Sequence, residues 1–116
     1  MRIRVPSKKI RERFLLIYEL KGCQKAVDFL TEYYGIRRIK IMLDGRKVGN
    51  GCEACYDRNV AYFTKRGLNR FNVLHELYHH IAEVFKLDMS ERIEEKEANR
   101  FAEENLKEYK KKSRRS

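Results

Sequence analysis

A pentad of the form HExxH, His75-Glu-Leu-Tyr-His79, lies inside a stretch whose apolar residues recur at helical spacing. The apolar stripe consists of Leu74, Leu77, Tyr78, Ile81 and Phe85. On a helix, residues four apart stand one above the other, so His75 and His79 share one face beside this stripe. The sequence therefore predicts a helix from about residue 69 to residues 86–88, with two imidazoles along its margin.

The pentad has the spacing of a metal-binding motif. Neutral imidazoles of His75 and His79 supply two of the three protein ligands that a catalytic zinc ion needs. Glu76 lies roughly 100° around the helix from His75. We therefore expect it to act as the general base on a water molecule that the metal activates, and not as a ligand. The predicted chemistry is amide hydrolysis by a zinc-dependent hydrolase, a metalloprotease.

A third ligand should come from another element. Ser90 can cap a second helix that runs to about residue 109, and its apolar side is formed by Ala98, Phe101, Ala102, Leu106 and Tyr109. Its acidic residues are Glu91, Glu94, Glu95 and Glu97. Periodicity leaves Glu91, Glu94 and Glu95 open as ligands. Asn99 favours Glu95, because it follows four residues later and is placed to hold a ligand side chain.

The remaining elements predict an α+β fold. Apolar residues at helical spacing predict N-terminal helices over about 7–22 and 24–34, the second ending at Gly35. Residues 36–43 alternate like a strand, and 54–56 and 59–63 predict two strands joined at Asp57-Arg58. The sequence thus predicts two N-terminal helices, a small antiparallel sheet, the helix with the pentad and a C-terminal helix with the third ligand.

The net charge of +10 is concentrated at the two ends of the chain. Residues 1–13 carry six Lys/Arg against Glu12, and residues 107–116 carry six against Glu108, whereas 14–106 hold fifteen of each sign. We therefore predict a single domain over 1–106 and a basic C-terminal tail over 107–116. Basic termini could contact nucleic acid or an acidic partner. Solvated ends explain them equally well, so nucleic acid is not the favoured partner.

The chain has no segment of the roughly 18 to 20 apolar residues that cross a bilayer, and its start lacks the apolar core of a signal peptide. Its three cysteines, an odd number, argue against a secreted disulfide scaffold. We predict a cytoplasmic protein that does not contact membranes. Cys52 and Cys55 have the spacing of a metal knuckle, but no second CxxC exists. We interpret them as buried structural cysteines. His80, roughly 100° from His79, is interpreted as a surface or packing residue.

Two segments together resemble the ImmA/IrrE-type metallopeptidases. The pentad is similar to the HExxH signature of that family, and Glu95-Lys-Glu-Ala-Asn99-Arg-Phe101-Ala102 is similar to its ExxANxFA-like segment. Residues 54–63 also resemble the strand pair that precedes the active helix in the family. The resemblance covers about residues 26–102.

The resemblance implies a zincin-like minimal peptidase domain with His75, His79 and Glu95 as zinc ligands and Glu76 as catalytic base. It also implies a substrate class, because members of the family inactivate a partner helix-turn-helix repressor by cutting it once. Two other interpretations stay open. A catalytically inactive zincin-like domain would act as a binding or regulatory protein through its basic termini. In a structural zinc site, a fourth protein ligand such as Glu91 or Glu94 would close the coordination.

Overall fold

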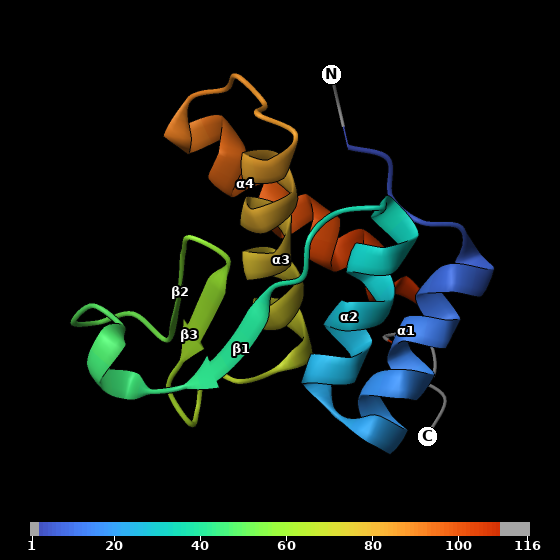
Figure 1. Ribbon diagram of the computed structural model, residues 1–116, viewed down its shortest axis with the longest axis horizontal. Coiled ribbons are helices and arrows are strands. Elements are labelled where there is room, and N and C mark those ends of the chain that lie inside the picture. The colour runs from blue at the N-terminus through green and yellow to red at the C-terminus, as the bar shows by residue number, and fades with distance from the viewer. Residues whose placement is uncertain (1–2, 110–116) are drawn as a thin grey trace.

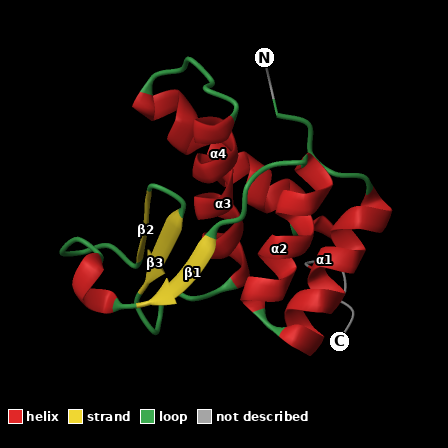
Figure 2. Ribbon diagram, in the orientation of Figure 1, coloured by secondary structure: helices red, strands yellow, loops and turns green. Residues whose placement is uncertain are grey.

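Four α-helices, one short 3-10 helix and a three-stranded sheet make up the part of the computed structural model that is described, residues 3–109 (Figure 1). In chain order they are α1 Lys8–Lys21, α2 Cys23–Tyr34, β1 Lys40–Leu43, η1 Gly45–Lys47, β2 Ala54–Asp57, β3 Val60–Phe63, α3 Arg70–Val84 and α4 Glu91–Asn105. The sheet lies to one side of the helices (Figure 2). The predicted α+β class is confirmed.

Glycines end the first two helices where the sequence predicts it. Gly22 follows α1 with φ 93°, and Gly35 follows α2 with φ 68°. Both values lie in the region that residues with a Cβ rarely adopt, so the chain can change direction at little steric cost. The sharp turn at Gly22 folds α2 back along α1.

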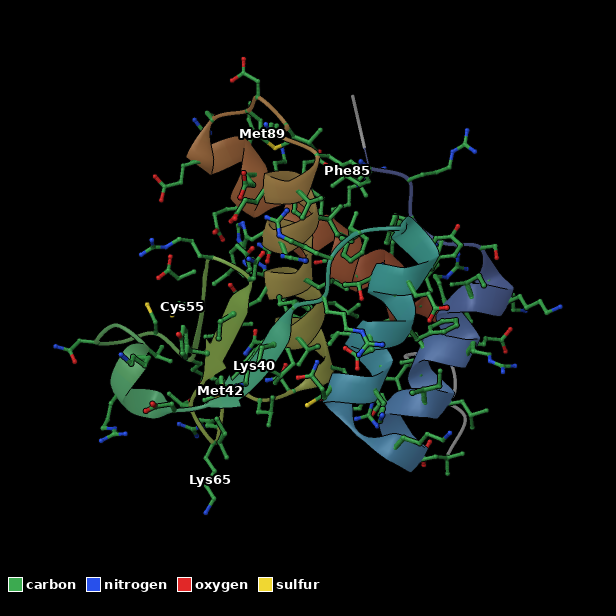
Figure 3. The ribbon with its side chains drawn as sticks, viewed as in Figure 1. Lys40, Met42, Cys55, Lys65, Phe85 and Met89 are labelled. Carbon is green, nitrogen blue, oxygen red and sulfur yellow. The ribbon has the colours of Figure 1, made fainter. Side chains whose placement is uncertain are left out.

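Side-chain caps begin the two later helices. Asn69 accepts the backbone N–H of Asn72 at the start of α3, and the Ser90 hydroxyl accepts that of Ile93 at the start of α4. The expectation that Phe85 completes the buried stripe of α3 is wrong. The helix ends at Val84, and Phe85, close to the α3–α4 connection, is 46% exposed (Figure 3). Helix α4 itself ends at Asn105, but after a turn residue at Leu106 the chain is helical again over residues 107–109, so helical structure reaches the predicted end at about 109.

The sheet is mixed and not wholly antiparallel. Its strand order is β1-β3-β2, with β2 antiparallel to β3 but β1 parallel to it. The segment between β1 and β2, which contains η1, carries the chain past the position of β3, so β3 fills the middle of the sheet. Arg58 and Asn59, with φ of 39° and 69°, form the two-residue turn that joins β2 to β3, one residue later than the predicted Asp57-Arg58, because Asp57 still pairs with Val60. As a result β2 is an outer strand.

One hydrophobic core joins the helices to one face of the sheet. Ala61 and Phe63 of β3 are fully buried against the helices. The other large, fully buried apolar side chains are Phe14, Leu30, Ile39, Leu74, Leu77 and Ile81. Because this core includes the apolar stripe of α3, it holds that helix in place and leaves the margin with the two imidazoles toward β2 and α4.

The chain continues to contact the body of the domain beyond residue 106, where the sequence predicts a tail. Glu108 forms an ion pair with Arg11 of α1 at 2.6 Å. The guanidinium of Arg70 lies 4.7 Å from the ring centroid of Tyr18 and 4.8 Å from that of Tyr109. Residues 110–116 of the predicted tail lie outside the described residues. None of the helices in the described part is long and apolar enough to cross a membrane.

The interpretation of Cys52 and Cys55 as buried structural cysteines is wrong. Cys52 is exposed in the loop before β2, whereas Cys55 on this outer strand and Cys23 are partly buried, and all three thiols are free. The Cys55 thiol donates a hydrogen bond to the carbonyl of Lys47 at 3.3 Å. Cys52 lies in a loop and Cys55 on an outer strand, so neither thiol is enclosed by the core.

Candidate metal centre

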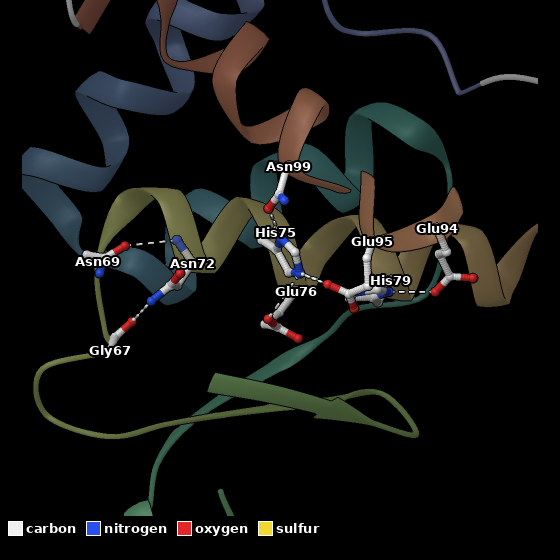
Figure 4. Close-up of polar contacts among 9 residues, drawn as sticks. All are labelled: Gly67, Asn69, Asn72, His75, Glu76, His79, Glu94, Glu95 and Asn99. Carbon is white, nitrogen blue, oxygen red and sulfur yellow. Dashed lines mark hydrogen bonds and ion pairs between the residues drawn. The ribbon is translucent and has the colours of Figure 1, made fainter. Parts of the chain in front are cut away.

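The local structure at the start of α3 fixes where its imidazoles lie. The side-chain amide of Asn72 donates to the carbonyl of Gly67 at 2.9 Å, and Asn69 caps the same turn (Figure 4). Because His75 and His79 follow one and two turns later, both lie on the same side of α3. Helix α4 packs along this side and brings its own acidic residues toward them.

The structure brings together the three residues that the sequence predicts as zinc ligands. Glu95 places one carboxylate oxygen 3.0 Å from Nε2 of His75 and the other 2.9 Å from Nε2 of His79 (Figure 4). The two Nε2 atoms are 3.3 Å apart. His75, His79 and Glu95 form a group that could hold a metal ion, the only such group found in the described chain.

Contacts of the other ring nitrogens favour a metal at this place. Nδ1 of His75 lies 2.8 Å from Oδ1 of Asn99, and Nδ1 of His79 lies 2.5 Å from Oε2 of Glu94. Each oxygen accepts a hydrogen bond from Nδ1, so a ring in its neutral form carries its proton on Nδ1 and presents the lone pair of Nε2 to Glu95. Burial, the largest influence, lowers the pKa of His75 and so favours its neutral form, although Glu95 opposes this.

The donor set fits zinc. Three lone-pair atoms that converge without a proton between them repel one another unless a cation lies among them. Tetrahedral zinc binds nitrogen and oxygen at roughly 2.0–2.1 Å, which places neighbouring ligand atoms roughly 3.3 Å apart. The observed separations of 2.9 to 3.3 Å are close to this spacing. Two imidazoles and one carboxylate are also a ligand combination found in catalytic zinc sites.

Glu76 lies beside this group without joining it. Its carboxylate is 3.9 Å from Nε2 of His75, and only 9% of its side chain is exposed. The pKa of Glu76 is raised to about 7, chiefly by burial; the charge of His79 opposes this shift, and the charge of Glu95 contributes to it. A carboxyl group with this pKa can accept and release a proton near neutral pH, which is the property that a general base requires.

The other acidic residues in the first half of α4 lie at different positions around the group formed by His75, His79 and Glu95. Glu94, one of the alternative ligands, contacts His79 on the side away from the three converging atoms. Glu91 lines the neighbouring cavity, and Glu97 lies 3.5 Å from Arg100. Asn99 holds a predicted ligand, but that ligand is His75 of α3 and not Glu95 of its own helix.

The contact of Glu94 with His79 was not predicted from the sequence. A signal was present in the sequence, because Glu94 and Glu95 are consecutive and point roughly 100° apart on a helix. Two such carboxylates on a crossing helix can reach both nitrogens of one imidazole.

Two cavities adjoin the centre, one on each side of His75 and Glu76. The larger, about 660 Å³, extends between β2 and the facing parts of α3 and α4. The smaller, about 460 Å³, extends toward the start of α3 and includes Asn99. Both are lined by Cys52 and Ala54 in addition to His75 and Glu76. The candidate centre thus lies midway along an open cleft.

Searches of protein-family models, curated proteins and solved structures find no match to this chain. Its function is therefore inferred from the residues and the geometry of this site.

Proposed function

We propose that this chain is a zinc-dependent metalloendopeptidase. The observation that carries the proposal is the convergence of His75, His79 and Glu95 beside the buried carboxyl group of Glu76. When bound, zinc in such a site polarises a peptide carbonyl and acidifies water. The two imidazoles and Glu95 hold the ion, while Glu76 accepts the proton of the attacking water and passes it to the leaving amine.

Other residues orient this machinery. Asn99 and Glu94 hold the two imidazoles in the tautomer that presents Nε2 to the ion. The cavities on either side of His75 and Glu76 leave room for a polypeptide to extend past the site in both directions. This arrangement suits cleavage within a chain better than removal of a terminal residue.

The proposed substrate is a DNA-binding regulator, such as a helix-turn-helix repressor. It is supported by the resemblance of the pentad and of residues 95–102 to the ImmA/IrrE-type metallopeptidases. Such a substrate, together with three free cysteines, suits an enzyme of the cytoplasm. The proposed fold assignment, a zincin-like minimal domain, has the same support.

The proposal is tested by comparing wild type with Glu76→Gln. Each protein is incubated with the regulator encoded beside its gene, and bound zinc and cleaved regulator are both quantified. We expect one zinc ion per chain in both proteins, a single cut by wild type, and a loss of cleavage of about 10²-fold or more in the variant. Undiminished cleavage by Glu76→Gln contradicts the proposed role of this residue. Wild type that binds zinc and the regulator without cutting it would instead be a catalytically inactive binding protein.

A further inference from the structure

His80 follows a proposed zinc ligand directly but belongs to a different set of contacts. It is fully buried, and both ring nitrogens are paired: Nε2 lies 2.7 Å from the carbonyl of Arg37, and Nδ1 lies 2.8 Å from the hydroxyl of Tyr56. A carbonyl only accepts, so Nε2 donates and Nδ1 accepts the Tyr56 proton. The sequence-based interpretation as a packing residue is therefore incomplete, because this ring connects α3 to two other segments.

Tyr56 and Asn59 extend these contacts into the turn between β2 and β3. The Tyr56 hydroxyl accepts the backbone N–H of Asn59 at 3.0 Å while it donates to His80. The side-chain oxygen of Asn59 accepts from Nε of Arg37 at 2.6 Å. Tyr56, His80, Arg37 and Asn59 thus form a closed set of hydrogen bonds, which we name the hairpin tie. It attaches the end of the β2–β3 hairpin to α3.

The strand held by the hairpin tie forms one wall of the cleft. Three consecutive residues, Ala54, Cys55 and Tyr56, line the larger cavity. Side chains alternate between the two faces of a strand, so three in succession can border one cavity only if it lies along the edge of the strand. Because the strand order makes β2 an outer strand, this edge is the one that β3 does not use.

We propose that Tyr56 and His80 are positioning residues that hold the free edge of β2 at a fixed distance from the metal-bearing side of α3. An extended peptide can form main-chain hydrogen bonds with a free strand edge. Its scissile carbonyl reaches Glu76 and the ion only if edge and helix keep the correct separation, since displacements of about 1 Å can cost about a hundredfold in rate. This inference rests on the proposed peptidase function and assigns a role to residues outside the catalytic set.

The test distinguishes the strand wall from the metal site by measuring how tightly each protein binds three probes: zinc is added to the metal-free protein, and two hydroxamates are added to the zinc-loaded protein. Zinc alone reports the ligands, acetohydroxamate reports the ion and its immediate surroundings, and a peptide hydroxamate also extends along the cleft. The variants are Tyr56→Phe, which removes only the hydroxyl, His80→Leu, which removes both hydrogen bonds, and His80→Gln, whose amide can donate and accept. Tyr62→Phe removes a hydroxyl from β3 that is not part of the hairpin tie and is the matched control.

We expect Tyr56→Phe and His80→Leu to weaken binding of the peptide hydroxamate by about tenfold to a hundredfold. Binding of zinc and of acetohydroxamate should change by less than about twofold, because each probes the ion and its ligands but not the strand wall. His80→Gln should recover most of the loss, and Tyr62→Phe should match wild type. If Tyr56 and His80 had a purely structural role, their variants would not weaken binding of the peptide hydroxamate alone. His80→Gln would also not recover that binding.

Two results would overturn the inference while leaving the proposed function intact. The first is a peptide hydroxamate that binds Tyr56→Phe and His80→Leu as tightly as wild type. The second is a peptide hydroxamate that binds wild type no tighter than acetohydroxamate, since the peptide would then gain nothing from the strand wall. Failure of wild type to bind zinc would instead refute the proposed function. If His80→Leu does not fold, Tyr56→Phe alone decides.

Discussion

Each imidazole of the candidate centre uses its second ring nitrogen to contact α4. Asn99 accepts from Nδ1 of His75, and Glu94 accepts from Nδ1 of His79. The contact of Glu94 is charge-assisted, which makes the ring a stronger electron donor at Nε2. Helix α4 therefore contributes to the centre through one proposed ligand and through the orientation of both others.

We expect Glu94→Gln and Asn99→Ala each to weaken zinc binding by about tenfold to a hundredfold, because the freed ring can rotate or change tautomer. Competition with a chromophoric chelator measures this affinity. Glu91→Gln is the matched control: it makes the same chemical change as Glu94→Gln in the same cavity, at a residue with no described contact to either imidazole. A loss in Glu91→Gln as large as in Glu94→Gln would show that Glu91 also serves the metal, as in a closed structural site.

The buried carboxyl group of Glu76 makes the free energy of unfolding of the metal-free protein depend on pH. Its pKa is raised from 4.5 to about 7 by burial, so between these values the unfolded chain loses a proton that the folded chain keeps. Stability consequently falls as pH rises from about 4.5 to about 7 and stays lower above that range. We expect metal-free Glu76→Gln to be more stable than metal-free wild type at pH 8, by up to about 3 kcal/mol.

Urea unfolding in the presence of a chelator, from pH 4 to pH 8, measures this effect. The difference in free energy of unfolding between the two proteins should grow across that range. It should be smallest at pH 4, where the protonated carboxyl group of Glu76 and the amide that replaces it are both neutral. Both proteins keep the same histidines, so the difference between them reports residue 76. Glu12→Gln on α1, where the side chain is exposed, controls for the loss of any carboxylate. A metal-free Glu76→Gln protein no more stable than wild type at pH 8 would contradict the raised pKa.

At the scale of elements, the helices could be predicted from sequence, whereas the sheet could be predicted only in part. Apolar spacing and the glycines at 22 and 35 are local signals, and they locate α1 and α2 closely. The turn at Arg58 and Asn59 is also local, so the β2–β3 pair was predicted. The parallel pairing of β1 with β3 depends on where α2 delivers the chain and on how η1 crosses, which no local pattern encodes.

The candidate site, like the fold, could be predicted from the sequence only in part. His75 and His79 could be predicted because their spacing acts within one helix. Glu95 could be favoured because Asn99 follows it on the same helix, although the partner of Asn99 is on α3. The contact of Glu94 with His79 depends on the path of α4 across α3, and the hydrogen bonds of His80 depend on the β2–β3 hairpin. Contacts between elements therefore account for most of what the sequence analysis missed.

The segment between β3 and α3 sets the start of the helix that carries His75 and His79, and it leaves no room for a side chain at Gly67. A Cβ at this position would lie 2.0 Å from the backbone oxygen of Glu53, which also accepts the N–H of Thr64 at 3.0 Å. We expect Gly67→Ala to lower the free energy of unfolding by about 1–3 kcal/mol, because two backbone segments must separate. Gly49→Ala is the control, since nothing lies within 4 Å of its Cβ position.

Urea unfolding of Gly67→Ala and Gly49→Ala at neutral pH measures both changes against wild type. The carbonyl of Gly67 also accepts from Asn72 in the first turn of α3, so a displaced residue 67 should disturb the beginning of this helix. Equal stabilities for the two variants would mean that the approach of Glu53 to Gly67 is not a constraint on the fold.

At the scale of the whole molecule, α1 and the last described residues meet beside the first turn of α3. Arg70 lies between the rings of Tyr18 and Tyr109, one from α1 and the other near the end of the described chain. Cation–π contacts of this kind stabilise by about 0.5–2 kcal/mol each. The residues after 106 thus contribute to packing around α1 and α3, which a division based on charge alone does not anticipate.

A bidentate ion pair between Arg11 and Glu108 also joins the residues after 106 to α1. Nε and Nη2 of Arg11 donate to the two carboxylate oxygens of Glu108 at 3.1 Å and 2.6 Å, and the two side chains are only 15% and 17% exposed. The hydrogen bonds from Arg11, the largest influence, lower the pKa of Glu108. A lowered pKa stabilises the fold above the ordinary value of 4.5, and this contribution is lost as pH falls through the lowered folded-state value.

Glu108→Gln should therefore reduce the free energy of unfolding by about 1 kcal/mol at pH 7, with the difference from wild type shrinking as pH falls below about 4. Glu104→Gln is the matched control, because its ion pair with Lys107 spans three residues of sequence and is more exposed, so it should change stability by less than about 0.5 kcal/mol. Urea unfolding at pH 7 and pH 3 measures both variants. A deficit in Glu108→Gln that is equally large at pH 3 would mean that packing of this side chain, and not its charge, connects the C-terminal residues to α1.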